Sequence, residues 1–130
     1  MGLKGWGMIR ARAIAIMSCL ASTMASGIDY PSKPIRLVVP YAAGGSTDTV
    51  ARIVGQQLSE RVGQQVVIDN RTGAGTIIGT EIAAQAAPDG YTVLMATPPL
   101  AINPALYGKV PYDVERDFAA VTNIAGSSFW

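Results

Sequence analysis

The stretch Ile35-Arg-Leu-Val-Val-Pro-Tyr-Ala-Ala-Gly-Gly-Ser-Thr-Asp48 joins two structural patterns and decides the fold. Its first five residues form an apolar, β-branched run that only Arg36 interrupts, and Pro40 follows directly. A buried strand that ends at a ladder-breaking proline has this pattern. The glycine pair and the polar residues after it indicate a loop that leads into a helix. We therefore predict a strand over 35–39, a loop over 41–47 and a helix from about Asp48.

The helix is predicted from apolar residues at three- and four-residue steps, and Gly63 supplies its stop signal. These apolar residues are Val50, Ile53, Val54, Leu58 and Val62. The same alternation then repeats along the chain. It predicts a strand over 65–69, a loop over 70–75, a helix from about Thr76 that ends at Pro88-Asp89-Gly90, and a strand over 91–96.

Strands that alternate with helices through short connections predict an α/β fold, with a parallel sheet wound by right-handed crossovers. Beyond Thr97 several prolines weaken the pattern. We expect only one helical turn there, near 104–107, and a strand near 120–124.

The first 25 residues have the order of a secretory signal peptide. Residues 1–12 carry positive charge and no acid, residues 13–24 are a short apolar run, and Thr23-Met24-Ala25 offers small residues before a cleavage point. The alternative is a first helix of the domain. We expect an exported, periplasmic protein whose domain spans residues 26–130.

Composition excludes several classes of site and partner. The chain has no histidine, and its one cysteine, Cys19, falls in the leader, so disulfide and Cys/His metal frameworks are not expected. Three of the ten basic residues also lie in the leader, which leaves seven against nine acidic residues, a net charge of 7 − 9 = −2. That balance predicts no nucleic-acid partner.

Ligands of open parallel sheets bind beyond the carboxyl ends of the strands, where the three loops 41–47, 70–75 and 97–99 are expected. Gly44 and Gly45 allow close backbone approach, and the helix after them presents unpaired N–H groups that favour an anion. Gly73 and Gly75 repeat this arrangement, so a small dicarboxylate is the predicted ligand. We interpret Asp48 as stabilising its own helix through the dipole, in preference to contacting the ligand.

Two alternatives compete with ligand capture. Gly73-x-Gly75-x-x-x-Gly79 resembles a dinucleotide-binding turn, although the next strand ends without an acidic residue for a ribose. A nicotinamide-binding enzyme fragment is therefore the main alternative, and a sensing domain of a transcription regulator is the other. Hydrolysis is not predicted, because Ser46 and Thr47 have no histidine to activate them. We expect no catalytic residue and no cofactor.

The chain resembles the Bug-type receptors, the substrate-binding proteins of tripartite tricarboxylate transporters. The resemblance runs over residues 29–122 through several motifs in fixed order. They are Tyr30-Pro-Ser-Lys-Pro-Ile-Arg-Leu-Val-Val-Pro-Tyr-Ala-Ala-Gly-Gly-Ser-Thr-Asp48, Gly63-Gln-Gln-Val-Val-Ile-Asp-Asn-Arg-Thr-Gly-Ala-Gly75, Ala87-Pro-Asp-Gly-Tyr-Thr-Val-Leu94, Asn103-Pro-Ala-Leu-Tyr107, Pro111-Tyr-Asp113 and Asp117-Phe118. Ala43, Thr72 and Thr76 depart from the family pattern, where two prolines and a glycine are usual.

The resemblance implies a non-enzymatic receptor with a type II periplasmic binding protein-like fold, monomeric when complete, that delivers a small carboxylate to membrane-embedded transporter subunits. Such receptors have two lobes and are longer, so we expect this chain to be the first lobe, ending before the second. By resemblance, backbone N–H groups and waters of two loops hold the carboxylate, with Thr97 added from the third. The candidate residues are Tyr41, Ala43, Gly44, Gly45, Ser46, Thr47, Gly73, Ala74, Gly75, Thr76 and Thr97.

Overall fold

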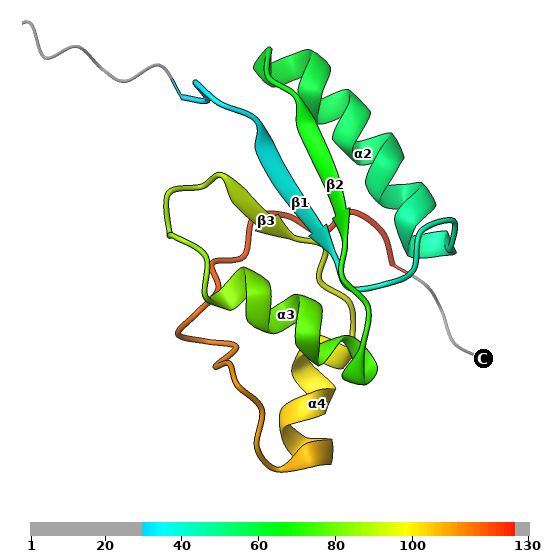
Figure 1. Ribbon diagram of the computed structural model, residues 1–130, viewed down its shortest axis with the longest axis vertical. Helices are drawn as coiled ribbons and strands as arrows, with labels where there is room; N and C mark the ends of the chain where they lie inside the picture. Colours follow the sequence, from blue (N-terminus) through cyan, green and yellow to red (C-terminus); the bar gives the residue numbers. More distant parts are fainter. Residues whose placement is uncertain (1–29, 127–130) are drawn as a thin grey trace, which may run out of the picture. The chain divides into compact units, whose positions relative to one another are not determined.

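The computed structural model describes residues 30–126, and the elements below belong to the unit that residues 31–130 form. The predicted signal peptide lies outside the described residues. The elements follow the order β1 (Ile35–Val39), α2 (Ser46–Val62), β2 (Val66–Asn70), η1 (Ala74–Thr76), α3 (Ile77–Ala84), β3 (Thr92–Leu94) and α4 (Pro99–Tyr107) (Figure 1). Among the described residues no helix combines the length and apolar character needed to cross a membrane.

The sheet is parallel and has the strand order β2-β1-β3. The register pairs Ile35 with Val66 on one side of β1 and Arg36 with Thr92 on the other. The first crossover therefore steps from β1 to β2, and the second returns past β1 to β3. Because both crossovers are expected to be right-handed, this reversal places α2 and α3 on opposite faces of the sheet. The predicted α/β class and the predicted parallel sheet are confirmed.

The core lies between α2 and the central strand. Leu37 and Val39 of β1 pack with Ala51 of α2 and with Met95, and Val38 is fully buried as well. A strand buried on both faces needs consecutive apolar residues, which explains why Leu37, Val38 and Val39 lack the alternation of a half-exposed strand.

The predicted apolar face of α2 was wrong for two residues. Val50 and Ile53 are 36% and 61% exposed, whereas Ala51 and Gly55 are buried. Gly55 explains the difference, because a Cβ there would lie 3.0 Å from Ile68 Cδ1 of β2. The helix approaches the sheet closely through its small residues, so its larger apolar side chains are turned outward or to the margin of the contact.

The elements that the structure shows toward the carboxyl terminus also differ from those predicted from the sequence. The second predicted helix ends at Ala84, short of Pro88, and the predicted helical turn near 104–107 is the end of the nine-residue helix α4. Two prolines suit the start of α4, because proline lacks only an N–H that has no helical partner there. The predicted strand near 120–124 is absent, since residues 119–126 form no helix or strand.

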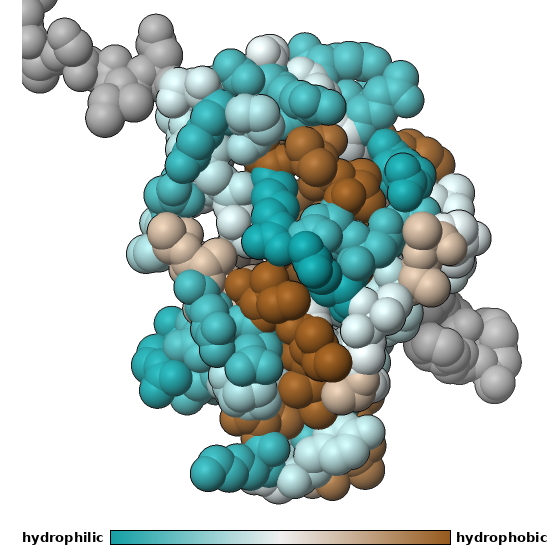
Figure 2. All heavy atoms as spheres, viewed as in Figure 1, coloured by the Kyte–Doolittle hydropathy of each residue, from teal (hydrophilic) through white to brown (hydrophobic). Residues whose placement is uncertain are grey.

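Hydrophobic side chains also remain on the surface. Figure 2 shows them gathered over α3 and α4, where Ile78, Ile102 and Leu106 are 44%, 54% and 67% exposed.

Candidate ligand-binding site at the carboxyl edge of the sheet

The three predicted loops meet at one edge of the sheet, because the strands that precede them are parallel. The reversal of strand order falls between β1 and β3, and such a switch point is where open α/β sheets form a ligand crevice. The Tyr41 hydroxyl lies 2.9 Å from Thr97 Oγ1 and joins the loops that follow these two strands. Two predicted site residues 56 positions apart are thus in direct contact.

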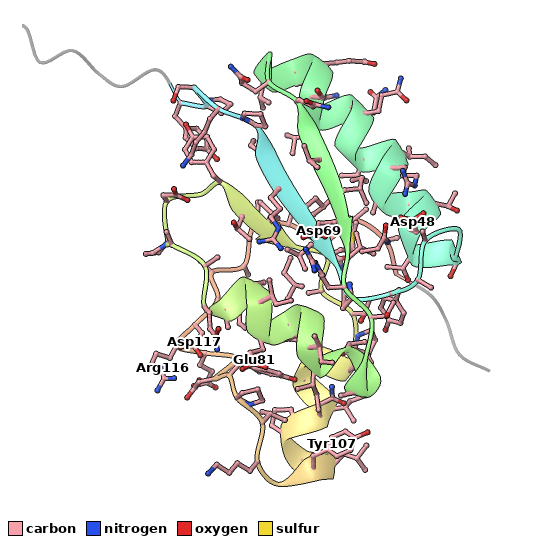
Figure 3. The ribbon with its side chains drawn as sticks, viewed as in Figure 1. Asp48, Asp69, Glu81, Tyr107, Arg116 and Asp117 are labelled. Carbon is pink, nitrogen blue, oxygen red and sulfur yellow. The ribbon has the colours of Figure 1, made fainter. Side chains whose placement is uncertain are left out.

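The carboxylate of Asp48 fixes the first loop through hydrogen bonds. Its side chain is only 2% exposed, and it accepts hydrogen bonds from Gly44 N at 2.8 Å, Arg52 Nε at 2.8 Å and Asn70 Nδ2 at 2.9 Å. Figure 3 shows Asp48 at the first turn of α2. The residue lies on the same helix face as Ala51, which points it toward the end of β2. Its role therefore goes beyond the helix-dipole effect predicted from the sequence.

This arrangement decides which N–H groups of the first loop are available to a ligand. The Gly44 N–H is occupied by Asp48. Gly45 is the N-cap of α2 and provides no side-chain cap, so the first-turn N–H groups of Ser46 and Thr47 have no partner within the helix. Ser46 is exposed and Thr47 is half-buried. The strongest anion-accepting position of this loop is consequently the start of α2.

The second loop has an unusual backbone. Four consecutive residues have positive φ, from Gly73 at 132° through Ala74 at 46° and Gly75 at 61° to Thr76 at 82°. For residues with a side chain the left-handed region costs about 1–2 kcal/mol each, so Ala74 and Thr76 store strain here. Strain of this kind persists where surrounding contacts enforce it, and it is concentrated at functional sites.

Asn103 of α4 supplies one of the enforcing contacts. Its Nδ2 donates to the Gly75 carbonyl at 2.8 Å, and Thr76 Oγ1 lies 3.4 Å from the same nitrogen. Thr80 Oγ1 donates to the Thr76 carbonyl at 2.9 Å. Asn103, Thr76 and Thr80 are all buried, and the contacts of Thr76 with Thr80 and Asn103 are buried with them, whereas the bond to the exposed Gly75 is part-buried. The helix after β3 therefore fixes the loop after β2.

The candidate residues differ in accessibility. Thr76 is buried and takes part in holding the loop, whereas the others are exposed or half-buried. Arg71 at the start of the second loop pairs with Asp69, its Nε 2.8 Å from Asp69 Oδ1. Asp69 also pairs with Arg36 on β1.

Sequence reasoning missed two residues that organise the site. Asn70 bridges loops, since its Nδ2 donates to the Tyr41 carbonyl at 3.0 Å as well as to Asp48. Asn103 bridges α4 and the second loop. The position of Asn70 at a strand end was a usable signal. Asn103 gave none, because its partners are 27 and 28 residues away.

The pKa of Asp48 is lowered from 3.8 to about 2, first by the hydrogen bond from Arg52 and then by those from Gly44 and Asn70. A carboxyl whose pKa is lowered by folding contributes its full stabilisation when the pH lies above the pKa that it has in the unfolded chain. We therefore expect this contribution to disappear as the pH falls from about 4 to about 2.

Denaturation midpoints measured across this pH range test the expectation. Asp69, Asp89 and Asp117 also have lowered pKa values, so the Asp48 contribution must be isolated as a difference. The chain with Asp48→Asn should lose less stability on acidification than the unmodified chain. Parallel curves for the two chains would contradict the assignment.

The described surface has two shallow hollows. One lies between α2 and β2 beside Gly55, and the other lies beside Arg36 and Asp69 and reaches Arg71 at the start of the second loop. Residues 30–126 contain no group of three or more His, Cys, Asp or Glu placed to hold a metal ion.

Known proteins match most of this chain. Residues 50–130 match the family described as tripartite tricarboxylate transporter family receptor. A UPF0065 protein from the tcbD–tcbE intergenic region of a Pseudomonas strain is 45% identical over 109 residues, which are 83% of this chain and 32% of that protein. Protein BugT of Bordetella pertussis is 38% identical over 124 residues, 90% of this chain and 38% of BugT. The chain thus spans about a third of the length of these relatives.

Solved structures show the same fold. A structure described as a periplasmic transporter has a TM-score of 0.63 and 52% identity, over 65% of this chain and 29% of its own. A Rhodopseudomonas palustris protein solved with adipate has a TM-score of 0.63 and 39% identity, over 66% and 29%. MatC of that species, with bound malate, has a TM-score of 0.58 and 35% identity, over 68% and 31%. The chain belongs to the tripartite tricarboxylate transporter receptor family.

Proposed function

We propose that this chain forms the first lobe of an extracytoplasmic receptor that captures a small carboxylate and delivers it to membrane-embedded subunits of a tripartite tricarboxylate-type transporter. Family membership supports this proposal, as do the neighbours solved with adipate and malate. It includes export through the predicted leader, residues 1–25, and capture without a chemical step or a cofactor. It is favoured over the dinucleotide-binding alternative because the family is one of receptors.

One observation carries the proposal: the start of α2 is open, uncapped by side chains and placed at the switch point of the sheet. A helix of 17 residues presents partial positive charge at its amino-terminal end. The flanking glycines, Gly44 and Gly45, let a ligand reach that end, and Asp48 holds the loop in place from below. A carboxylate matches these donors in charge and geometry.

The second loop gives the ligand another polar surface. Ala74 and Gly75 are exposed, and the contacts of Asn103 and Thr80 keep their backbone in a left-handed turn. In the proposed mode one carboxylate binds at α2 and a second end of the ligand approaches this loop. In the proposed mode Thr97, whose hydroxyl contacts that of Tyr41, faces the ligand from the third loop.

Calorimetric titration of the purified chain tests the proposal with a panel of mono-, di- and tricarboxylates, and with NAD and NADP as controls. Saturable binding of carboxylates, without a response to the dinucleotides, is the expected result. Binding of a dinucleotide, or of no carboxylate, would overturn the proposal.

A proline substitution at Ser46 tests the contact itself. Proline is tolerated at the first helical position and removes only its N–H, and the extended backbone of Gly45 is suited to the residue before a proline. Ser46→Pro should leave the unfolding temperature nearly unchanged and weaken carboxylate binding about 10-fold, because a charge-assisted hydrogen bond is lost. Ser46→Ala keeps the N–H and is the matched control. Equal affinities of the two variants would place the carboxylate elsewhere.

A further inference from the structure

Helix α4 places a tyrosine hydroxyl against the second loop. Asn103 and Tyr107 are four residues apart and therefore lie on the same face of the helix. Asn103 holds the Gly75 carbonyl at 2.8 Å, and a Cβ on Gly75 would lie 3.3 Å from the Tyr107 hydroxyl oxygen. The absence of a side chain at Gly75 is thus what gives the hydroxyl room beside the loop backbone.

Tyr107 differs from the other tyrosines that contact this part of the fold. Its residue surface is 54% exposed, and its hydroxyl has no hydrogen-bond partner among residues 30–126. The Tyr41 hydroxyl is instead paired with Thr97, and Tyr112 is buried against Phe118. Figure 3 shows Tyr107 on α4, the helix that packs against the second loop. The residue is exposed, its hydroxyl can donate a hydrogen bond, and α4 fixes its position.

The second loop has few donors of its own to offer. The Thr76 N–H is used by the Gly73 carbonyl at 3.0 Å, and the Thr76 hydroxyl faces Asn103. The basic residue at the start of the loop, Arg71, pairs with Asp69. The remaining backbone donors of the loop are those of Gly73, Ala74 and Gly75, and Gly75 lies beside the Tyr107 hydroxyl. An anion at this loop would gain a neutral donor from α4.

We infer that Tyr107 is a specificity-determining residue that donates a hydrogen bond to the second carboxylate of a dicarboxylate, at the loop formed by Gly73, Ala74, Gly75 and Thr76. The inference rests on the proposed function and deepens it by naming the ligand class. The start of α2 holds the first carboxylate of any ligand, whereas Tyr107 contacts only a ligand that has a second one. Tyr107 therefore selects dicarboxylates over monocarboxylates.

The test compares adipate with hexanoate, which have the same carbon chain and differ in the second carboxylate. Tyr107→Phe removes the hydroxyl alone and, at an exposed position, should leave the unfolding temperature unchanged. We expect the affinity for adipate to fall about 10-fold and the affinity for hexanoate to stay the same, because only one charge-assisted hydrogen bond is lost. Tyr112→Phe is the control, since it removes a buried hydroxyl that has no partner among the described residues.

The possible results distinguish the role of Tyr107 from carboxylate capture by the chain. Unchanged adipate binding in Tyr107→Phe, or an equal loss for both ligands, overturns the role of Tyr107 and leaves carboxylate capture standing. An unmodified chain that binds no carboxylate overturns both. A loss for adipate alone, absent from Tyr112→Phe, supports both.

Discussion

Replacing Asp48 by alanine should abolish carboxylate binding and lower the unfolding temperature by about 5–10 °C, because one buried carboxylate satisfies three donors from three parts of the chain. Without it, the Gly44 N–H loses its acceptor, and the Asn70 amide keeps only its bond to the Tyr41 carbonyl. The first loop is then held less firmly at its distance from the end of β2. Calorimetry and thermal unfolding measure the two effects on the same sample.

Asp117→Ala is the matched control for this change. Asp117 also accepts a backbone N–H four residues before it, from Asp113 at 2.8 Å, and also pairs with an arginine, Arg116. It lies outside the three loops, so its loss should leave binding intact. If Asp48→Ala binds carboxylates as well as the unmodified chain does, Asp48 does not set the geometry of the first loop.

Gly79→Ala should be the most damaging single-methyl change in α3. An added Cβ would lie 2.7 Å from the Arg71 carbonyl oxygen, 2.8 Å from Pro40 Cβ and 3.0 Å from Pro40 Cα. Backbone atoms cannot give way as a flexible side chain can. Overpacking of about 3 kcal/mol outweighs the gain in helix propensity of about 1 kcal/mol, so the expected net loss is about 2 kcal/mol.

The two obstructing residues follow β2 and β1 directly, and this gives the Gly79→Ala substitution a functional readout as well. A displaced α3 moves the beginnings of both ligand loops, so affinity should fall together with stability in urea denaturation. Gly126→Ala adds the same methyl group where nothing lies within 4 Å, and it should change neither quantity. A Gly79→Ala chain of unchanged stability would show that α3 packs less tightly on the strand ends.

Local patterns predicted the strands and helices well where a single principle controls them. The apolar run of β1 and the spacing after Asp48 correctly located β1 and α2 to within two residues. The outward direction of Ile53 was not predictable, because it depends on Gly55 packing against Ile68 of another element. Helix α4 was underestimated because prolines were taken as breaks, although Pro99 occupies the favourable first position.

The meeting of the three candidate loops at one edge of the sheet was predictable from the sequence, whereas the contacts that shape these loops were not. The three loops follow from the order of strands and helices, and their glycines are visible in the sequence. The contacts that shape them join distant residues: Asn70 to Asp48, Asn103 to Gly75, and Tyr41 to Thr97. Sequence spacing carries no information on such pairs, so the predicted donor at Gly44 was found occupied by Asp48.

The strand order has a consequence for the sequence of events during synthesis. Of the strands within residues 30–126, β1 is the first to leave the ribosome, yet both of its partners come later, Val66 31 residues after Ile35 and Thr92 56 residues after Arg36. Until then its apolar residues have no sheet to enter, and closing such long loops slows folding. The strand made first is therefore completed last, and in that interval it is the segment of the sheet most in need of a chaperone.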